Sequence, residues 1–225
     1  LPGRQEELIK RVAATGKPVV VVLVGGSAVV MSEWLDKVPA VLNAWYPGEQ
    51  GGTAVADVLF GDYNPAGRLP LTYYKSLDEL PAFDDYDITK GRTYKYFKGD
   101  VLYPFGYGLS YSSFKYSDLK VKDGANTVSV SFRLKNTGKR KGDEVAQVYV
   151  RIPETGGVVP IKELKGFRRI PLKSGESRVV EIELDKEQLR YWDAGLGRFI
   201  VPQGAFDIMV GASSKDIRLQ TVINL

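Results

Sequence analysis

The hydrophobic pattern of this chain changes character about halfway along its 225 residues. In residues 1–74, short apolar runs alternate with segments of helical periodicity, which is typical of strands and helices that follow one another in βαβ units. From Phe114 onward, apolar residues recur at every second position, and turn residues interrupt them at intervals of roughly 8 to 12 residues. This switch predicts two structural units in series, an α/β unit and an all-β unit.

The first unit reads as part of an α/β sandwich with a mostly parallel sheet. The run Val19–Val24 is β-branched throughout but for Leu23, as expected of a strand buried on both faces of a parallel sheet. The expected elements are, in order, a helix over 4–15, a strand over 19–24, a short helix over 32–37, a strand over 40–45, a helix over 53–60 and an extended segment over 69–73. About three strands are fewer than a doubly wound sheet contains, so we expect only half of such a sheet.

Residues 75–113 lose this periodicity and are rich in Tyr and Phe. Disordered linkers are poor in aromatic residues. We therefore expect an ordered connector that packs across both units.

Residues 114–225 predict an immunoglobulin or fibronectin type III-like sandwich of about seven short strands. The clearest strands are expected at 126–132, 145–150, 165–172, 178–184, 199–201 and 205–210. The predicted division is thus 1–74, 75–113 and 114–225.

Composition excludes several kinds of site. The chain has no Cys and no His, so thiolate chemistry, disulfides and a Ser-His-Asp triad are impossible within it. The net charge is +4, and the basic residues are interspersed with acidic ones, a pattern that does not favour nucleic-acid binding. No apolar run approaches the roughly 20 residues that span a bilayer, so no membrane partner is expected. The acidic turn at 84–87 lacks the spacing of a calcium loop, and no metal site is predicted.

Two loops follow the predicted strands of the α/β unit. The loop at Gly25-Gly26 lacks the full dinucleotide-binding pattern and is read as a tight turn. The loop over 45–52, WYPGEQGG, leaves a strand and opens a helix, which is where open α/β sheets bind ligands. A structural turn with a buried Trp45 is an equally good reading of this second loop.

Several long segments together resemble glycoside hydrolase family 3, and the likeness extends over nearly the whole chain. They are LPGRQ at 1–5, KPVVV at 17–21, WYPGEQGGTAVADVLFGDYNPAGRLPLT at 45–72, GRTYKYFKGDVLYPFGYGLSYSSF at 91–114, and KGF at 165–167. The resemblance implies the C-terminal portion of such an enzyme, namely the second half of its α/β sandwich domain and a fibronectin type III-like domain. The form GRTYKYF is more similar to the xylosidase and arabinosidase-type members, with β-glucosidase as a close alternative.

The resemblance also implies what the chain does not carry. In the family, a preceding barrel holds the Asp nucleophile, and the acid/base Glu lies a few residues before the LPG segment. Neither role falls on a residue here, and Glu6, Glu7 and Glu49 do not occupy the acid's position. The expected partner is therefore the upstream barrel and sandwich portion of the same enzyme, and the chain alone is expected to be inactive.

The implied activity is that of a retaining exo-β-glycosidase, which removes terminal β-xylosyl or β-glucosyl residues from oligosaccharides or glycosides. Two carboxylates suffice for this chemistry, so no cofactor is implied. The residues expected to line the leaving-group side of the pocket are Trp45, Glu49, Arg92 and Tyr94; the alternative is that they pack the seam between units. A homodimer is a further possible association. The rival function is a non-catalytic module that binds polysaccharide or protein, since a sandwich fold alone does not decide function.

Overall fold

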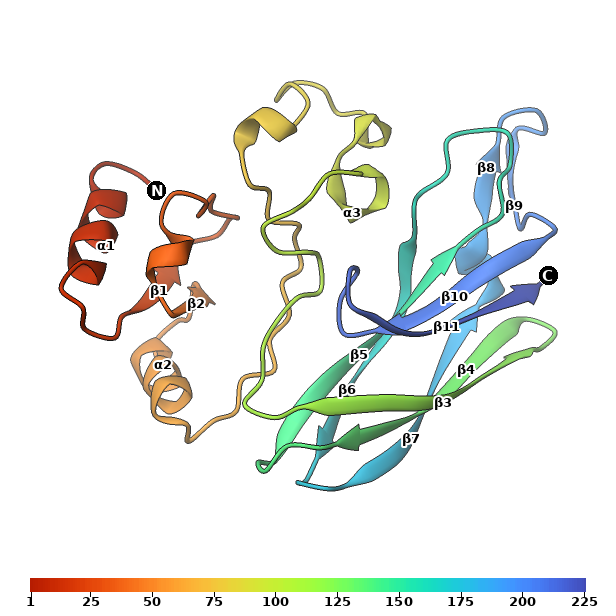
Figure 1. The fold of residues 1–225 in the computed structure, drawn as a ribbon. Helices are drawn as coiled ribbons and strands as arrows, with labels where there is room; N and C mark the ends of the chain where they lie inside the picture. Colours follow the sequence, from red (N-terminus) through yellow and green to blue (C-terminus); the bar gives the residue numbers. More distant parts are fainter.

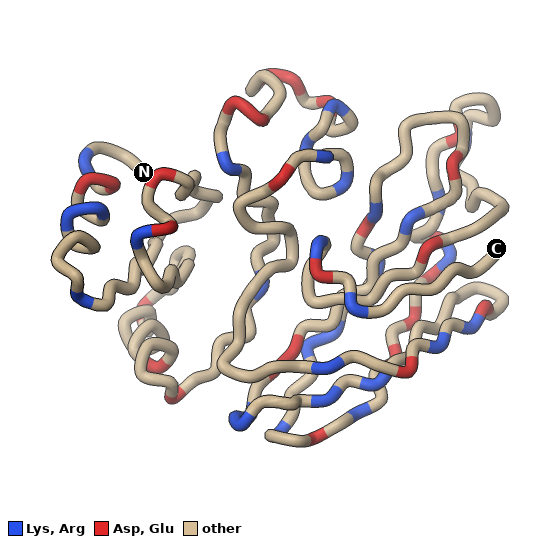
Figure 2. Tube along the Cα trace, viewed as in Figure 1, with Lys and Arg blue, Asp and Glu red and all other residues tan.

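The computed structural model describes residues 1–225 as three parts arranged in a row. Figure 1 shows a small α/β unit in red and orange, a connector in yellow and light green, and a β-sandwich in green and blue. Acidic and basic positions are mixed along the chain in all three parts (Figure 2). No helix is long and apolar enough to cross a membrane.

The α/β unit holds two strands and two main helices. Helix α1 has acidic residues in its first turn and basic residues in its last, which suits the helix dipole. Helix α2 ends at Gly61, whose φ of +85° lies in the left-handed region that glycine adopts without strain. The elements are α1 (Gln5–Ala13), β1 (Val20–Val24), the 3-10 turn η1 (Leu35–Lys37), β2 (Ala40–Trp45) and α2 (Gly51–Phe60).

The expectation of a mostly parallel sheet is wrong. Strands β1 and β2 do pair in parallel, but they form a two-stranded sheet, and every other sheet in the molecule is antiparallel. The expected third strand, 69–73, runs instead beside the connector, where Tyr73 bridges Tyr103 in antiparallel fashion. Pro70 lacks an N–H, which interrupts any longer ladder.

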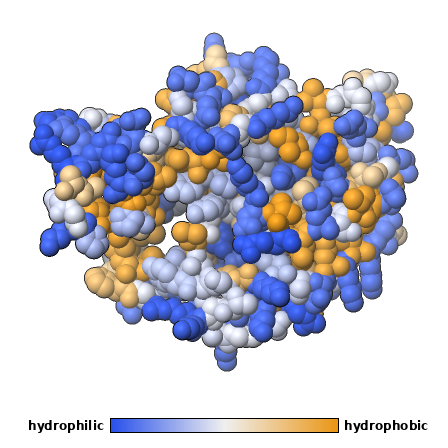
Figure 3. Space-filling model, in the orientation of Figure 1, coloured by the Kyte–Doolittle hydropathy of each residue, from blue (hydrophilic) through white to orange (hydrophobic).

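The sheet of the α/β unit is also less covered than the sequence predicts. Of β1 only Leu23 is buried, whereas Val20 and Val24 are 45% and 65% exposed. A small core of Leu23, Met31, Trp34, Val38 and Tyr73 lies beneath η1 and the connector. Hydrophobic side chains therefore remain at the surface of this unit, visible in Figure 3 around α2.

The connector contains no strand and folds around short helical turns. These are η2 (Leu77–Glu79), η3 (Ile88–Lys90) and α3 (Thr93–Tyr96). Its residues Leu102 and Tyr103 pack on the core of the α/β unit, and Phe105 stacks with Tyr94 beside Tyr149 of the sandwich. The connector thus contacts both units.

The sandwich consists of two antiparallel sheets of seven long strands in total. One sheet has the order β11-β10-β5-β6 and the other β3-β4-β7, and a small hairpin β8-β9 with the turn η4 (Lys186–Leu189) completes the unit. The strands are β3 (Phe114–Asp123), β4 (Thr127–Asn136), β5 (Gly142–Arg151), β6 (Glu163–Leu172), β7 (Ser177–Asp185), β8 (Tyr191–Asp193), β9 (Arg198–Ile200), β10 (Ala205–Gly211) and β11 (Ile217–Asn224).

Alternating side chains from the facing sheets form the main core of the protein. In β4, Val128, Val130, Phe132 and Leu134 point inward and are no more than 1% exposed. This is the period-two pattern that predicted the strand. The core joins eighteen buried residues, which makes it the larger of the two cores.

Candidate functional site

The loop over 45–52 lies where β2 ends, as the sequence predicts. Trp45 is half-buried and has a φ of +54°, a left-handed conformation that is unfavourable for a bulky side chain. Its carbonyl oxygen accepts a hydrogen bond from the N–H of Gly25 (3.1 Å), so the backbone holds it in place. The side chain of Glu49, four residues on, is exposed.

The two loops that follow β1 and β2 touch each other. The ring of Tyr46 lies over Gly26, so close that a Cβ on that glycine would approach the ring to 2.7 Å. Tyr46 is nevertheless 78% exposed. This edge of the α/β unit thus exposes the ring of Tyr46 and the carboxylate of Glu49 to solvent.

Arg92 is bound to the connector's own backbone. Its guanidinium donates hydrogen bonds to the carbonyl oxygens of Ala82 (2.6 Å) and Pro81 (3.3 Å), while its Nε is buried without a partner. The next residue, Thr93, has a φ of +61°, and its N–H donates to the hydroxyl of Tyr74 (2.7 Å). Arg92 therefore fixes the loop that leads into α3.

Tyr94 packs in the seam between the connector and the sandwich. Its ring stacks on Phe105 with centroids 4.4 Å apart and meets Tyr149 edge-on at 5.9 Å. Its hydroxyl accepts a hydrogen bond from the N–H of Leu164 (3.0 Å), and burial raises the pKa of this phenol. Tyr94 also lines a hollow of about 450 Å³.

The four residues predicted from the sequence fall into two pairs. Trp45 and Glu49 belong to the α/β unit, whereas Arg92 and Tyr94 lie in the connector. No hydrogen bond or ion pair joins one pair to the other; each is held by its own neighbours. A contact with substrate stays a prediction for all four.

The acidic turn at 84–87 is a structural element of the connector. Asp85 pairs with Lys90 (2.7 Å), and Asp87 caps η3 by accepting hydrogen bonds from the N–H and hydroxyl of Thr89. Each of these hydrogen bonds lowers the pKa of the carboxyl that accepts it. No group of three or more carboxylates in the chain converges in a way that would hold a metal ion.

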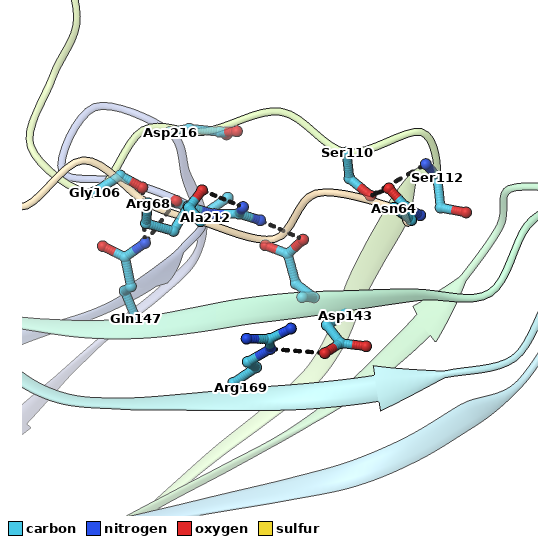
Figure 4. A network of polar contacts seen from close by, with 12 residues as sticks. Asn64, Arg68, Gly106, Ser110, Ser112, Asp143, Gln147, Arg169, Ala212 and Asp216 are labelled. Carbon is cyan, nitrogen blue, oxygen red and sulfur yellow. Dashed lines mark hydrogen bonds and ion pairs between the residues drawn. The ribbon is translucent and has the colours of Figure 1, made fainter. Parts of the chain in front are cut away.

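A polar network that the sequence did not predict joins the α/β unit to the sandwich (Figure 4). Asn64 is one centre of it: its amide donates to the carbonyl of Lys141 (2.9 Å), and its side-chain oxygen accepts from the hydroxyl of Ser110 (2.9 Å) and the N–H of Tyr111 (2.8 Å). Three segments far apart in the sequence thus meet at one amide.

The second centre of the network is a buried ion pair. Arg68 donates to Glu144 at 3.1 Å, and the two side chains are only 8% and 4% exposed. The hydroxyl of Tyr116 donates to the other oxygen of Glu144 (2.9 Å). Burial, reinforced by this carboxylate, raises the pKa of Tyr116. The group lies at a second hollow, of about 750 Å³.

The third centre is Gln147 of β5. Its amide donates to the carbonyls of Ala212 (2.7 Å) and Gly106 (3.1 Å), and its oxygen accepts from Tyr149 (2.6 Å). Gly106 has a φ of +82°, and a Cβ there would lie 2.1 Å from the oxygen of Gln147. Only glycine allows this approach.

Two family models match the chain in succession. The model described as "Glycosyl hydrolase family 3 C-terminal domain" matches residues 1–111, and that described as "Fibronectin type III-like domain" matches residues 144–214. Among curated proteins, a xylan 1,4-beta-xylosidase of Xylanibacter ruminicola is 43% identical over 99% of this chain. A periplasmic beta-glucosidase of Salmonella typhimurium is 37% identical over 97% of it.

Solved structures agree with these matches. Beta-glucosidase 3B from Thermotoga neapolitana, solved in complex with glucose, matches all of this chain with a TM-score of 0.92 and 36% identity. Beta-glucosidase from Kluyveromyces marxianus, in complex with glucose, matches it with a TM-score of 0.94 and 34% identity. The chain covers 34% and 29% of these two structures, and 26% and 30% of the two curated relatives. The chain belongs to glycoside hydrolase family 3, in which it corresponds to the C-terminal portion of longer members.

Proposed function

We propose that the protein to which this chain belongs is a retaining exo-β-glycosidase that removes terminal β-xylosyl or β-glucosyl residues from oligosaccharides or glycosides. The observation that carries this proposal is that nearly the whole chain matches relatives named as xylosidases and glucosidases in sequence. Its fold also matches that of a solved beta-glucosidase along the full length of the chain. The higher identity to the xylan xylosidase favours a xyloside, with a glucoside as the alternative.

The 225-residue chain acts, in this proposal, as a support for a catalytic pair that lies elsewhere in the enzyme. A glycosidase needs a carboxylic acid whose pKa is raised so that it can protonate the leaving group. The carboxyl groups whose pKa departs from the ordinary value, such as Glu163, Asp85 and Asp100, are all shifted downward. This supports an assignment of the proton donor to another part of the enzyme.

Trp45 and Glu49 are proposed to face substrate or the rest of the enzyme, because they lie at the carboxyl end of β2, where Trp45 is half-buried and Glu49 is exposed. Arg92 and Tyr94 are proposed to contribute to the same side by shaping the connector. The division into residues 1–74, 75–113 and 114–225 is proposed on the two separate cores and the connector between them.

The test compares the full-length enzyme with the 225-residue chain on nitrophenyl β-D-xyloside and β-D-glucoside. We expect turnover from the full-length enzyme, with the β-anomer as first product in NMR spectra, and none from the chain alone. Turnover by the pure chain would overturn the supporting role, and an α-anomer would overturn retention. If neither protein hydrolyses either glycoside, the non-catalytic module is favoured. The exposed pair Trp192 and Phe199 on the β8-β9 hairpin would then be tested for binding to insoluble xylan.

A further inference from the structure

Helix α2 begins within the loop over 45–52 and ends close to the sandwich (Figure 1). None of its side chains belongs to either hydrophobic core, and among its residues only Gly51, in the first turn, is buried. Its last two residues, Leu59 and Phe60, are 43% and 84% exposed. Burial in a core therefore does not hold this helix, which leaves the contacts at its two ends to orient it.

Two side chains bind backbone carbonyls at the C-terminal end of α2. Arg140, in the loop between β4 and β5, donates a hydrogen bond to the carbonyl oxygen of Gly61 (3.1 Å). Its guanidinium packs directly on that glycine, because a Cβ there would lie 2.8 Å from the Nη1 of Arg140. The hydroxyl of Tyr111 donates to the carbonyl oxygen of Val58 (2.7 Å). A cation beside the last carbonyls of a helix is also favoured by the helix dipole.

Arg140 is itself held in place by the residues around it. Its carbonyl oxygen accepts hydrogen bonds from the side-chain amide of Asn136 (2.8 Å) and from the hydroxyl of Ser112. Asn136 is fully buried at the end of β4. The guanidinium also lies 5.9 Å from the ring centroid of Tyr111, which is within the range of a cation–π contact. The C-terminal end of α2 is thus bound to a well-packed part of the molecule.

A third contact follows directly after the helix. The N–H of Tyr63 donates back to the carbonyl of Asp57 in α2 (3.0 Å), and its hydroxyl accepts a hydrogen bond from Arg169 of β6 (2.7 Å). Arg169 is in turn paired with Asp143 of β5 (2.7 Å). Two segments of the sandwich and the end of the connector therefore converge on this end of α2.

The N-terminal end of α2 is joined closely to the loop over 45–52. The N–H of Gly51 donates to the carbonyl of Gly48 (3.2 Å). The ring of Pro47 lies against Gly51, where a Cβ would approach the ring to 2.6 Å. A displacement of the first turn of α2 therefore also displaces this part of the loop, which includes Glu49.

The loop depends on support at both of its ends. The φ of +54° at Trp45 is unfavourable, and a conformation of this kind persists only where the surrounding structure imposes it. At one end, the carbonyl of Trp45 accepts a hydrogen bond from the N–H of Gly25 (3.1 Å). At the other end lies α2, whose ten residues form a stiff element about 15 Å long. The helix can therefore transmit a constraint from its C-terminal end to the loop.

From these contacts we propose that Arg140 is a positioning residue of the enzyme. By holding the C-terminal end of α2, it fixes the place of the loop over 45–52, and with it Trp45 and Glu49. This inference rests on the proposed function, in which these two side chains face substrate. It gives the sandwich a part in substrate binding, although no residue of the sandwich makes a hydrogen bond or ion pair with the loop.

Steady-state kinetics of the full-length enzyme test the proposal, on whichever nitrophenyl β-glycoside it hydrolyses. Arg140→Met keeps the reach of the side chain and removes its charge and its donors. We expect KM to rise about fivefold and kcat to change less than about twofold, because the variant disturbs a binding loop and not the reacting groups.

Lys139→Met is the matched control for the kinetics. Lys139 is the neighbour of Arg140 in the same exposed loop, and its side chain has no partner on α2. We expect its KM and kcat to equal those of the parent enzyme. An unchanged KM in Arg140→Met, or an equal change in the control, overturns the proposal.

The place of the loop is measured without substrate in the 225-residue chain. We expect the amide NMR signals of residues 48–52 to move in Arg140→Met and to stay in Lys139→Met. Tyr111→Phe should move them in a smaller degree, because it removes only the hydroxyl that binds Val58. This second variant also decides the matter if Arg140→Met does not fold. Signals that stay in place in both variants overturn the coupling through α2.

The two measurements can fail separately. If the full-length parent enzyme hydrolyses neither glycoside, the proposed function fails, and the NMR comparison still decides whether Arg140 positions the loop. If the loop signals move but the KM of an active enzyme does not, α2 transmits the change to a loop that does not bind substrate. That outcome overturns the assigned part of Arg140 in substrate binding.

Discussion

The β-sandwich and the α/β unit bury their apolar side chains to very different degrees. The sandwich encloses eighteen buried residues between two sheets that cover each other, whereas the α/β unit has a core of five, one of which, Tyr73, meets the connector. Its strand β1 leaves Val20 and Val24 largely exposed. The comparison shows that the sandwich has a core of its own, and that the α/β unit depends on what lies against it.

The largest expected effect comes from removing a core ring of the sandwich. Phe206 is fully buried, and Phe206→Ala should reduce the free energy of unfolding by about 3–5 kcal/mol. Leu23→Ala, in the α/β core, should cost about 2 kcal/mol, because a thinly covered site relaxes more easily. Urea titrations followed by far-UV circular dichroism measure both effects.

Phe199→Ala is the control for this comparison, since Phe199 is 60% exposed on β9 and should cost less than about 1 kcal/mol. If Leu23→Ala destabilises the protein as much as Phe206→Ala does, the α/β unit is as well packed as the sandwich, and the contrast drawn above fails.

A somewhat smaller effect is expected at the junction of the two regions. Glu144→Gln keeps the shape of the side chain but leaves the guanidinium of Arg68 buried without a counter-charge, which should cost about 3 kcal/mol. The variant should also uncouple the two regions. In a Trp192→Phe background, Trp34 and Trp45 report on the α/β unit by fluorescence, while circular dichroism reports mainly on the sandwich.

We expect the unfolding midpoints measured by fluorescence and by circular dichroism to differ by a larger urea concentration in Glu144→Gln than in the parent. Asp143→Asn is the comparison variant, because the ion pair of Asp143 with Arg169 is more exposed than that of Glu144. Equal behaviour of the two variants would show that the buried pair does not couple the units.

The smallest expected effect depends on pH and tests the connector's attachment to the sandwich. Burial alone would raise the pKa of Glu163, but hydrogen bonds from Lys165 and Lys95 outweigh it and lower the pKa below the ordinary value of 4.5. A carboxyl whose pKa is lowered on folding stabilises the protein above its unfolded pKa, and this contribution is lost as the pH falls through the folded value.

Glu163→Gln should therefore reduce stability by about 1 kcal/mol at neutral pH and by progressively less below pH 4.5. Thermal melts at a series of pH values measure the difference from the parent. A difference that persists undiminished at the acidic end would mean that the side chain acts through packing and not through its charge.

Much of the fold follows from local pattern, and the failures have a common cause. The helices α1 and α2 and the strands β1 and β2 follow from local periodicity. The segment 69–73 is extended, as expected, but it pairs with residues 102–107 of the connector, a pairing that no local pattern reveals. Strand β11 is not among the clearest predicted strands, although the exposure of its side chains alternates along its length.

The candidate site shows the same limit. The loop after β2 could be placed at a strand end because the strand and the loop follow one another directly in the sequence. The buried pair of Arg68 and Glu144 could not, since the two residues are 76 positions apart in the chain and no local pattern joins them. A buried ion pair of this kind becomes visible only when the surroundings of both side chains are known.

The attachment of the connector to β5 determines where the chain can be truncated without exposing buried residues. Tyr149 is fully buried and meets the ring of Tyr94, which stacks on Phe105, and the amide of Gln147 donates a hydrogen bond to the carbonyl of Gly106. A shortened protein that started at Phe114 would uncover this aromatic surface and leave it open to self-association. A shortened protein that starts at Arg92 keeps these residues with the sandwich. The smallest part of the chain that could be fused to another protein therefore begins inside the connector.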